Sequence, residues 1–326
     1  MNERGIWMKN LYVTRKLPEK FLSQLTPYYN ITYWDDEHSV PTQQFTMKQL
    51  KTADAFWTNV ADQVTKDMID AAPNLEMLSN LAVGYSNIDA AYLQQKGIIL
   101  TNTPNVLNNA TADLAFALLL ATARRLPQNR EAIYRNEWGS WSVDFGIGLD
   151  VSEKTIGIIG MGKIGQTFAK RAAGFDMNIL YHNRSRNVEA EEKLNATYCS
   201  LHELLQQSDF VVILTPLTNE TRNLITLNEL KLMKSSAVLI NAARGGIVNE
   251  ADLYKALKEQ IIWAAGSDVF EVEPITADHP LLSLHNFLAL PHLGSATVET
   301  REAMMQCNVD SLIAAAKGEP IPYVVK

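Results

Sequence analysis

Apolar and polar positions alternate along the chain in blocks that predict two successive α/β regions. In the first region, short apolar runs typical of strands occur near residues 10–14, 31–34, 54–58, 76–81 and 98–101, and helical patterns separate them. Strands that alternate with helices at this spacing indicate a parallel sheet.

A second series of apolar runs begins halfway along the chain and predicts another parallel sheet. Its candidate strands are Thr155–Ile159, Asn178–His182, Phe210–Leu214, Ala237–Asn241, Ile262–Ser267 and Phe287–Leu290. These are six strands, the number in a complete dinucleotide-binding sheet.

Two longer helical patterns, from about Asn108 to Arg124 and from Thr297 to Lys317, flank the second region. The later helix has no domain of its own, so we expect it to return to the first region. This predicts a substrate domain made of residues 8–106 and 297–326, with a nucleotide-binding domain of residues 107–296 inserted into it. Residues 1–7 precede Met8 and the first strand, and we expect them to form a loose extension.

Glycines follow the first strand of the second region at G-x-G-x-x-G spacing. Gly160 would allow a tight turn, Gly162 would let the backbone approach a pyrophosphate, and Gly165 would let a helix pack close to the strand. Lys163 and Ile164 begin that helix, whose N-terminus would face the phosphates. The alternative is a tight structural turn without a ligand, but the strand before and the helix after it favour dinucleotide binding.

The end of the next strand bears on the choice of nucleotide. NAD-binding folds usually place an acid there, about twenty residues beyond the glycines, on the ribose hydroxyl. This chain has Asn183 instead, followed by Arg184 and Arg186. A neutral amide with two arginines would attract a 2′-phosphate, so the sequence favours NADP. If the arginines merely lie on a solvated loop, NAD remains possible.

Arg244, Glu273 and His292 each follow a predicted strand, and ligands bind at the carboxyl ends of such strands. Arginine can hold the carboxylate and carbonyl oxygen of a 2-oxo acid, and histidine can donate a proton to the developing alkoxide. A carboxylate would orient the imidazole. Glu271 fits the spacing as well as Glu273, and Asp268 could be a structural cap. We interpret the remaining histidines as packed or surface residues: His38, His182, His202, His279 and His285.

Composition and charge argue against some classes of partner and bear on the location of the protein. The net charge of −7 argues against nucleic acid or an anionic membrane as a main partner. The apolar run from Leu114 to Ala123 is too short to span a bilayer. Cys199 and Cys307 match no metal spacing and are expected to be reduced thiols, so we expect a cytoplasmic protein without a metal.

Four segments together resemble the D-isomer-specific 2-hydroxyacid dehydrogenase family. They are Gly157–Gly165, Asn241–Gly246, Asp268–Pro274 and Pro291–Thr297, and the resemblance extends over nearly the whole chain after Met8. It implies two doubly wound parallel-sheet domains of α/β class, a Rossmann domain inserted into a flavodoxin-like substrate domain.

The resemblance also implies roles for individual residues. It assigns Arg244 as substrate anchor, Glu273 as histidine partner and His292 as acid/base, and it gives the substrate carboxylate the backbone N–H groups of Val83 and Gly84. Besides the glycine loop and the residues near Asn183, it assigns these residues to the cofactor: Thr215, Pro216, Ala242, Arg244, Asp268, His292 and Gly294.

Within the family, the chain is similar to the glyoxylate, hydroxypyruvate and 2-ketogluconate reductases, which implies reduction of 2-oxo acids to D-2-hydroxy acids. Together with the residues after the second strand, this predicts an NADPH-preferring reductase. Two alternatives are an NAD(H)-dependent dehydrogenase of different substrate range and a non-catalytic, corepressor-like nucleotide sensor. The resemblance further implies a homodimer with an arm around Trp138 and Trp141. An ordinary buried aromatic pair is the alternative at these two residues.

Overall fold

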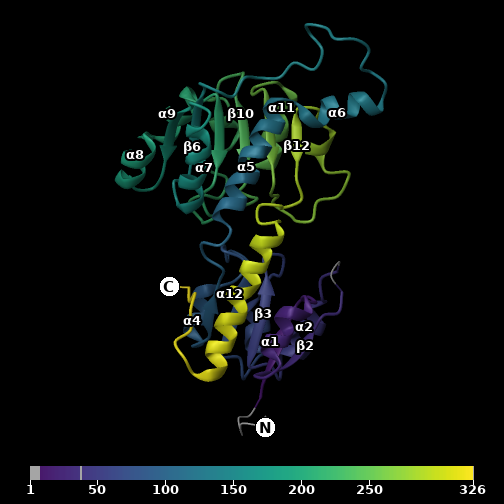
Figure 1. The fold of residues 1–326 in the computed structure, drawn as a ribbon, viewed down its shortest axis with the longest axis vertical. Helices are drawn as coiled ribbons and strands as arrows, with labels where there is room; N and C mark the ends of the chain where they lie inside the picture. The colour runs from purple at the N-terminus through teal and green to yellow at the C-terminus, as the bar shows by residue number, and fades with distance from the viewer. Residues whose placement is uncertain (1–7, 37–38, 326) are drawn as a thin grey trace. The chain divides into compact units, whose positions relative to one another are not determined.

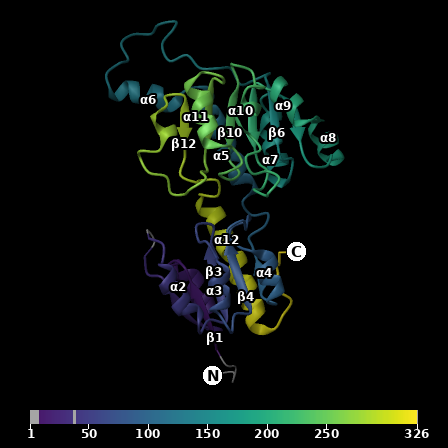
Figure 2. The same ribbon diagram turned by 180° about the vertical axis from the view of Figure 1, so that it is seen from behind.

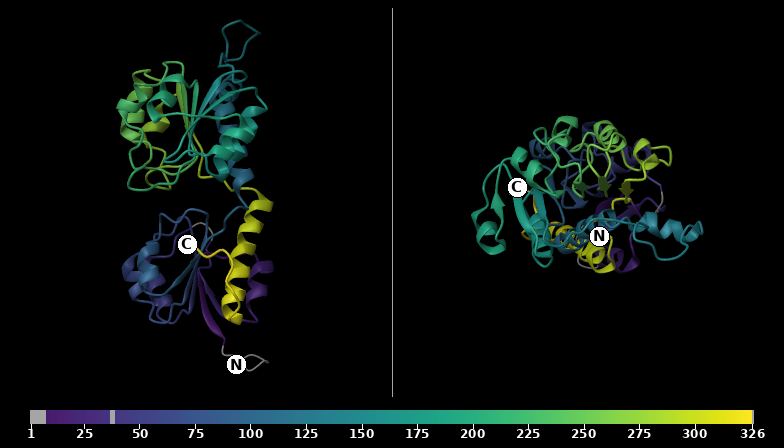
Figure 3. Two further views of the ribbon diagram at one scale, coloured as in Figure 1. Left: turned by 90° about the vertical axis from the view of Figure 1, so that its left-hand side faces the viewer. Right: turned by 90° about the horizontal axis from the view of Figure 1, so that it is seen from above.

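The computed structural model describes residues 8–36 and 39–325. The expectation for residues 1–7 and the interpretation of His38 lie outside the described residues. The chain divides into two compact units, one of residues up to Leu107 together with those from Thr297 onward, the other from Asn108 to Ala296 (Figure 1). Each unit is a parallel sheet between two helical layers, which confirms the predicted α/β fold class (Figure 3).

The first unit has a five-stranded parallel sheet in the order β2-β1-β3-β4-β5. Its strands are β1 (Lys9–Val13), β2 (Tyr29–Tyr33), β3 (Ala55–Asn59), β4 (Met77–Leu81) and β5 (Ile99–Thr101). Its helices are α1 (Glu19–Leu25), α2 (Gln43–Leu50), α3 (Lys66–Asp70), α4 (Ala90–Gln95) and α12 (Val298–Lys317). All five expected strands are present, with bounds shifted by one or two residues.

Apolar side chains on the two faces of this sheet form two separate cores. One core joins Tyr12, Phe56 and Leu78 to the helices α2, α3 and α4. The other joins Leu11 and Trp57 to α1 and α12. The two views of the ribbon show these helix sets on opposite faces (Figures 1 and 2).

Helix α12 completes the first unit although it follows the second unit in sequence. Thr297 caps its N-terminus by accepting a hydrogen bond from Thr300 N–H, and Gly318 ends it at φ 69°. Two buried hydrogen bonds fix the helix to the sheet: Tyr29 donates to Leu312 O at 2.8 Å, and Asn308 Nδ2 donates to Ser79 Oγ at 2.7 Å.

The second unit has a seven-stranded parallel sheet in the order β12-β11-β10-β9-β6-β7-β8. Its strands are β6 (Thr155–Ile159), β7 (Asn178–His182), β8 (Thr197–Tyr198), β9 (Phe210–Ile213), β10 (Val238–Asn241), β11 (Ala264–Ser267) and β12 (Phe287–Ala289). The six predicted strands are present, but the expectation that they complete the sheet is wrong. The seventh strand, β8, lies at one edge of the sheet; it is only two residues long and has no apolar run that could reveal it.

The sheet of the second unit lies between two layers of helices. These are α5 (Asn108–Ala123), α6 (Leu126–Tyr134), α7 (Lys163–Ala173), α8 (Val188–Leu194), α9 (Leu201–Gln207), α10 (Leu227–Leu230), α11 (Glu250–Lys258) and the short 3-10 helix η1 (Pro280–Ser283). Phe116 of α5 packs against Phe168 of α7 over one face. The opposite face is covered by α9, α10 and α11 (Figure 2).

The order of the strands indicates where in this sheet a ligand crevice is expected. From β6 the chain runs outward through β7 to β8, and then returns to β9 on the other side of β6. In open parallel sheets, ligands bind at the carboxyl ends of the strands at such a reversal. The loops that begin at Gly160 and Leu214 lie at this point of the sheet.

No helix among the described residues is long and apolar enough to cross a membrane.

Candidate functional site

The glycine loop after β6 has the backbone geometry that a bound diphosphate requires. Gly160 has φ 105°, and a Cβ there would lie 2.6 Å from Thr215 N. A Cβ on Gly165 would lie 2.0 Å from the Gly160 carbonyl oxygen, so the helix could not pack this close with any other residue. At Gly162 a Cβ would meet nothing within 4 Å, so open space lies in front of this residue.

Helix α7 begins directly after Gly162, its N-cap residue. Lys163 and Ile164 lie in its first turn, the end of a helix where the helix dipole favours an anion. The loop after β9 lies beside Gly160 and carries Thr215 and Pro216. These residues fit the diphosphate of a dinucleotide.

Asn183 follows β7 and supports the glycine loop. Its Oδ1 accepts a hydrogen bond from Met161 N–H at 2.7 Å. Asn187 Nδ2 donates to the Met161 carbonyl at 3.1 Å. The neutral amide of Asn183 thus lies where NAD-binding folds commonly place a carboxylate, and Asn187 adds a second bond to the same loop.

The two arginines after Asn183 differ in their surroundings. Arg184 is exposed, and its charge contributes to lowering the pKa of Glu220. Arg186 instead forms a two-pronged ion pair with Glu191, with Nε to Oε1 at 2.8 Å and Nη2 to Oε2 at 2.7 Å. Spacing in the sequence does not distinguish the two arginines, whereas the structure pairs Arg186 with the carboxylate of Glu191.

His292 and Glu273 form a hydrogen-bonded pair. Nδ1 of His292 lies 2.7 Å from Oε2 of Glu273, and the two side chains are 27% and 34% exposed. Oε1 of Glu273 accepts a hydrogen bond from Phe270 N–H at 2.8 Å. Because Nδ1 is engaged, Nε2 is the ring nitrogen left to exchange a proton with a ligand. The structure therefore joins the predicted Glu273, not the alternative Glu271, to His292.

The charge state of Glu273 follows from its neighbours. Partial burial acts to raise its pKa, but the hydrogen bond and charge of His292, with smaller contributions from Phe270 N–H and Arg244, outweigh burial. The pKa of Glu273 is therefore lowered from its ordinary 4.5, and the carboxylate is ionised at neutral pH.

A lowered pKa in the folded state predicts a pH-dependent contribution to stability. Ionised Glu273 stabilises the fold above its ordinary pKa of 4.5, and the contribution is lost as pH falls through the folded-state value. We expect Glu273→Gln to lower the free energy of unfolding at neutral pH, with a difference from the native protein that shrinks in acid. Urea denaturation across this range measures it, with the exposed Glu271→Gln as control. A difference that stays constant with pH would contradict the prediction.

Asp268 supports the loop that carries His292. Its side chain is 1% exposed, and its two oxygens accept hydrogen bonds from Leu293 N–H at 2.7 Å and Gly294 N–H at 2.9 Å. Its carbonyl accepts from His292 N–H at 2.9 Å, and His292 itself has φ 56°. Burial raises the pKa of Asp268, although these backbone bonds oppose the shift. The structural alternative for this carboxylate is therefore what the structure shows, and its contact with nicotinamide stays a prediction.

Arg244 lies in the loop after β10, close to Glu273. Its guanidinium donates to the Ala243 carbonyl at 2.7 Å. Burial lowers its pKa and the charge of Glu273 opposes that shift, but an arginine remains charged in either case. The structure thus brings a partly buried cation and the His292–Glu273 pair to one edge of one sheet, with the buried Ala242 between Arg244 and β10.

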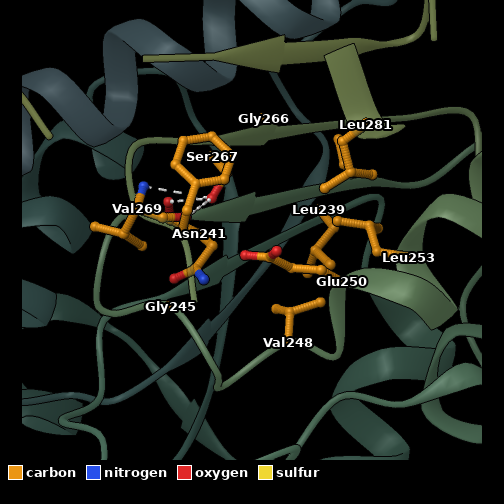
Figure 4. A pocket seen from close by; sticks show the side chains of 12 residues that line it. Leu239, Asn241, Gly245, Val248, Glu250, Leu253, Gly266, Ser267, Val269 and Leu281 are labelled. Atoms are coloured by element: carbon orange, nitrogen blue, oxygen red, sulfur yellow. Dashed lines mark hydrogen bonds between the residues drawn. The ribbon is translucent and has the colours of Figure 1, made fainter. Parts of the chain in front are cut away.

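Two polar residues to which the sequence assigned no role, the buried Asn241 and the partly buried Glu250, hold these loops together. Asn241 Nδ2 donates to the Arg244 carbonyl at 3.0 Å, and Glu250 accepts from Glu271 N–H at 2.6 Å. A Cβ at Gly245 would lie 1.8 Å from Phe270 O, so the loops after β10 and β11 are in backbone contact. Figure 4 shows Asn241, Gly245 and Glu250 around a cavity of about 10 Å³, room for about one water. Spacing alone gives no signal for Glu250, because its partner is a backbone group of another loop.

Comparison with known proteins identifies the family of this chain. A sequence profile described as "D-isomer specific 2-hydroxyacid dehydrogenase, NAD binding domain" matches residues 116–294. A glyoxylate reductase of Pyrococcus horikoshii is 45% identical over 319 residues, covering 97% of this chain and 95% of the relative. The chain belongs to the D-isomer-specific 2-hydroxyacid dehydrogenase family. It is an NAD(P)-dependent oxidoreductase.

Solved structures of family members have the same fold. One is an NADPH-dependent glyoxylate/hydroxypyruvate reductase of Sinorhizobium meliloti in complex with NADP and malonate; it is 31% identical, has a TM-score of 0.85 and covers 98% of this chain and 97% of its own. Another is a glyoxylate reductase of Paecilomyes thermophila, 30% identical with a TM-score of 0.86, covering 98% of each chain. These relatives support reduction of a 2-oxo acid as the activity and NADP or NAD as the cofactor.

Proposed function

We propose that this dehydrogenase reduces small 2-oxo acids of the glyoxylate, hydroxypyruvate or 2-ketogluconate type to D-2-hydroxy acids, with a preference for NADPH. The observation that carries the proposal is the 2.7 Å His292–Glu273 pair at the same sheet edge as Arg244. The relatives whose names specify glyoxylate or hydroxypyruvate reduction support the substrate class.

Each group at this edge has a task in such a reduction. The bound cofactor supplies the hydride. Arg244 holds the carboxylate and the carbonyl oxygen of the substrate, and its charge stabilises the negative charge that develops on that oxygen. Nε2 of His292 donates the proton that completes the hydroxyl group. Ionised Glu273 keeps the imidazole oriented and stabilises its protonated form before transfer.

The preference for NADPH is proposed from the end of β7. A carboxylate beside the ribose would repel a 2′-phosphate, and Asn183 supplies a neutral amide there instead. Arg184 adds an exposed positive charge next to it. The Sinorhizobium meliloti relative, whose name states NADPH dependence, is in line with this proposal.

The proposal predicts how cofactor use responds to one substitution. We expect the native protein to oxidise NADPH faster than NADH in the presence of glyoxylate or hydroxypyruvate. Arg184→Asp should reduce kcat/KM for NADPH by roughly tenfold to a hundredfold, because a charge-assisted contact to the phosphate is replaced by repulsion. The activity with NADH should change little. Initial rates over a panel of 2-oxo acids, taken with both cofactors, measure these effects.

A matched control separates this contact from net charge. Lys193→Asp makes the same change in charge at an exposed residue of α8 that pairs with Glu189, and it should leave the NADPH preference unchanged. If Arg184→Asp leaves the preference unaltered, the NADPH proposal is wrong. If the native protein reduces no acid of the panel with either cofactor, the reductase proposal fails and a nucleotide-sensing role is favoured.

We also propose that the protein is a homodimer through the segment that follows α5. Trp138 and Trp141 are 60% and 83% exposed, so the alternative of a buried aromatic pair is wrong. Other large apolar side chains of the same segment are exposed: Leu126, Ile133, Tyr134, Val143, Phe145 and Ile147. A patch of this kind is typical of a protein interface. A monomeric mass in sedimentation equilibrium would contradict this assembly.

We also propose a cytoplasmic location. The free thiols Cys199 and Cys307 support this proposal.

A further inference from the structure

In the loop after β4 of the first unit, three consecutive backbone carbonyl oxygens each accept a hydrogen bond. Ala82 O accepts from Thr103 N–H at 3.0 Å. The next carbonyl, of Val83, accepts from Asn102 Nδ2 at 2.8 Å, and the carbonyl of Gly84 accepts from Asn80 Nδ2 at 3.0 Å. Three successive peptide groups are therefore fixed by donors that come from β4 and from the segment after β5.

These bonds also set the direction of the N–H groups. In a planar trans peptide the N–H points opposite to the C=O. The N–H groups of Val83, Gly84 and Tyr85 consequently point away from Thr103, Asn102 and Asn80. Among the described residues none of the three donates a hydrogen bond, and Val83 and Gly84 are only partly buried.

Consecutive backbone N–H groups that face outward form a concave site for an anion. We propose that Asn80 and Asn102 are positioning residues that orient the N–H groups of Val83, Gly84 and Tyr85 to bind the carboxylate of the 2-oxo acid. This inference rests on the proposed function for the identity of the anion. It adds the third N–H group, of Tyr85, and the two asparagines that hold the loop.

Asn80 shows how strongly the fold maintains this arrangement. The residue is 0% exposed, and its Oδ1 is buried without a hydrogen-bond partner. A buried polar atom without a partner destabilises a fold. An apolar residue in this strand would avoid that cost, but it could not donate to the Gly84 carbonyl.

The test compares substitutions that keep or change the shape of the side chain. Asn102→Asp preserves the shape but removes the donor to the Val83 carbonyl, and Asn102→Ala removes both. We expect each to raise KM for glyoxylate by roughly tenfold to a hundredfold, with kcat and NADPH affinity close to native values. Asn308→Asp is the matched control, because Asn308 is a buried asparagine of the same unit whose amide donates to Ser79 and not to the loop.

Binding of oxalate, measured by calorimetry, tests the loop without turnover and should weaken by the same factor. An active native enzyme whose Asn102 variants keep native KM and oxalate affinity would overturn the inference alone. A native protein without reductase activity would overturn the proposed function, and the oxalate measurement would still decide the inference. If Asn308→Asp changes KM and oxalate affinity as much as the Asn102 variants do, the effect is a general disruption of the unit. That result would also overturn the inference.

Discussion

Replacing His292 by glutamine is expected to reduce kcat for 2-oxo acid reduction by roughly a hundredfold to ten-thousandfold, the usual contribution of a positioned general acid. Glutamine is similar in length, and its amide can still hydrogen-bond to Glu273, so the loop held by Asp268 should keep its place. It cannot donate a proton to an alkoxide. The loss should therefore appear in kcat, while NADPH affinity, measured by fluorescence titration, stays within about threefold of the native value.

A second histidine of the same unit provides the control. His202 is exposed on α9, and His202→Gln should leave both kcat and NADPH affinity unchanged. Near-native turnover in His292→Gln would remove His292 from the acid/base role. A parallel loss of NADPH binding would instead assign it a role in holding the cofactor.

Replacing Arg244 by lysine is expected to lower kcat/KM for glyoxylate by roughly a hundredfold. Lysine keeps the positive charge, but it lacks the planar fork that bonds a carboxylate and a carbonyl oxygen together. Loss of one charge-assisted hydrogen bond costs about 1.5–3 kcal/mol, and loss of orientation adds to it. Both kcat and KM should change, because the anchor contacts the bound substrate and also the oxygen that becomes negatively charged.

Steady-state kinetics with varied glyoxylate at saturating NADPH measure this effect. Arg222→Lys is the control, since Arg222 is an exposed arginine of the same unit. If Arg244→Lys retains kcat/KM within about threefold of the native value, a single point charge is sufficient and the proposed two-bond grip is wrong.

The strands that could be predicted from the sequence are those formed by strong apolar runs. β6 and β7 have the predicted bounds, and the loops with Arg244, Glu273 and His292 follow β10, β11 and β12 as expected, because buried parallel strands are continuous apolar runs. β8 escaped prediction because a two-residue edge strand contains too few positions to show a pattern.

Side-chain partners were harder to predict than positions. The pairing of Arg186 with Glu191 depends on how the turn after β7 meets α8, and the support that Asp268 gives to Leu293 and Gly294 joins residues 25 and 26 positions apart. Such contacts are set by tertiary structure, which local spacing does not encode.

Asn105 shows a local feature that the sequence could suggest. It has φ 74° in the structure, in the left-handed region that few residues adopt. Asparagine is one of the few residues besides glycine that tolerates this region, so the residue type is compatible with the backbone conformation.

The return of α12 to the first unit has a consequence for biosynthesis. All of residues 108–296 leave the ribosome before Val309 and Leu312, which are both 0% exposed in the core of the first unit. The nucleotide-binding unit therefore has its whole sequence available while the amino-terminal unit still lacks one covering helix. We expect nascent chains to carry a folded carboxyl-proximal unit next to an amino-terminal sheet with an exposed apolar face. The order of folding would then be the reverse of the order in which the two units begin.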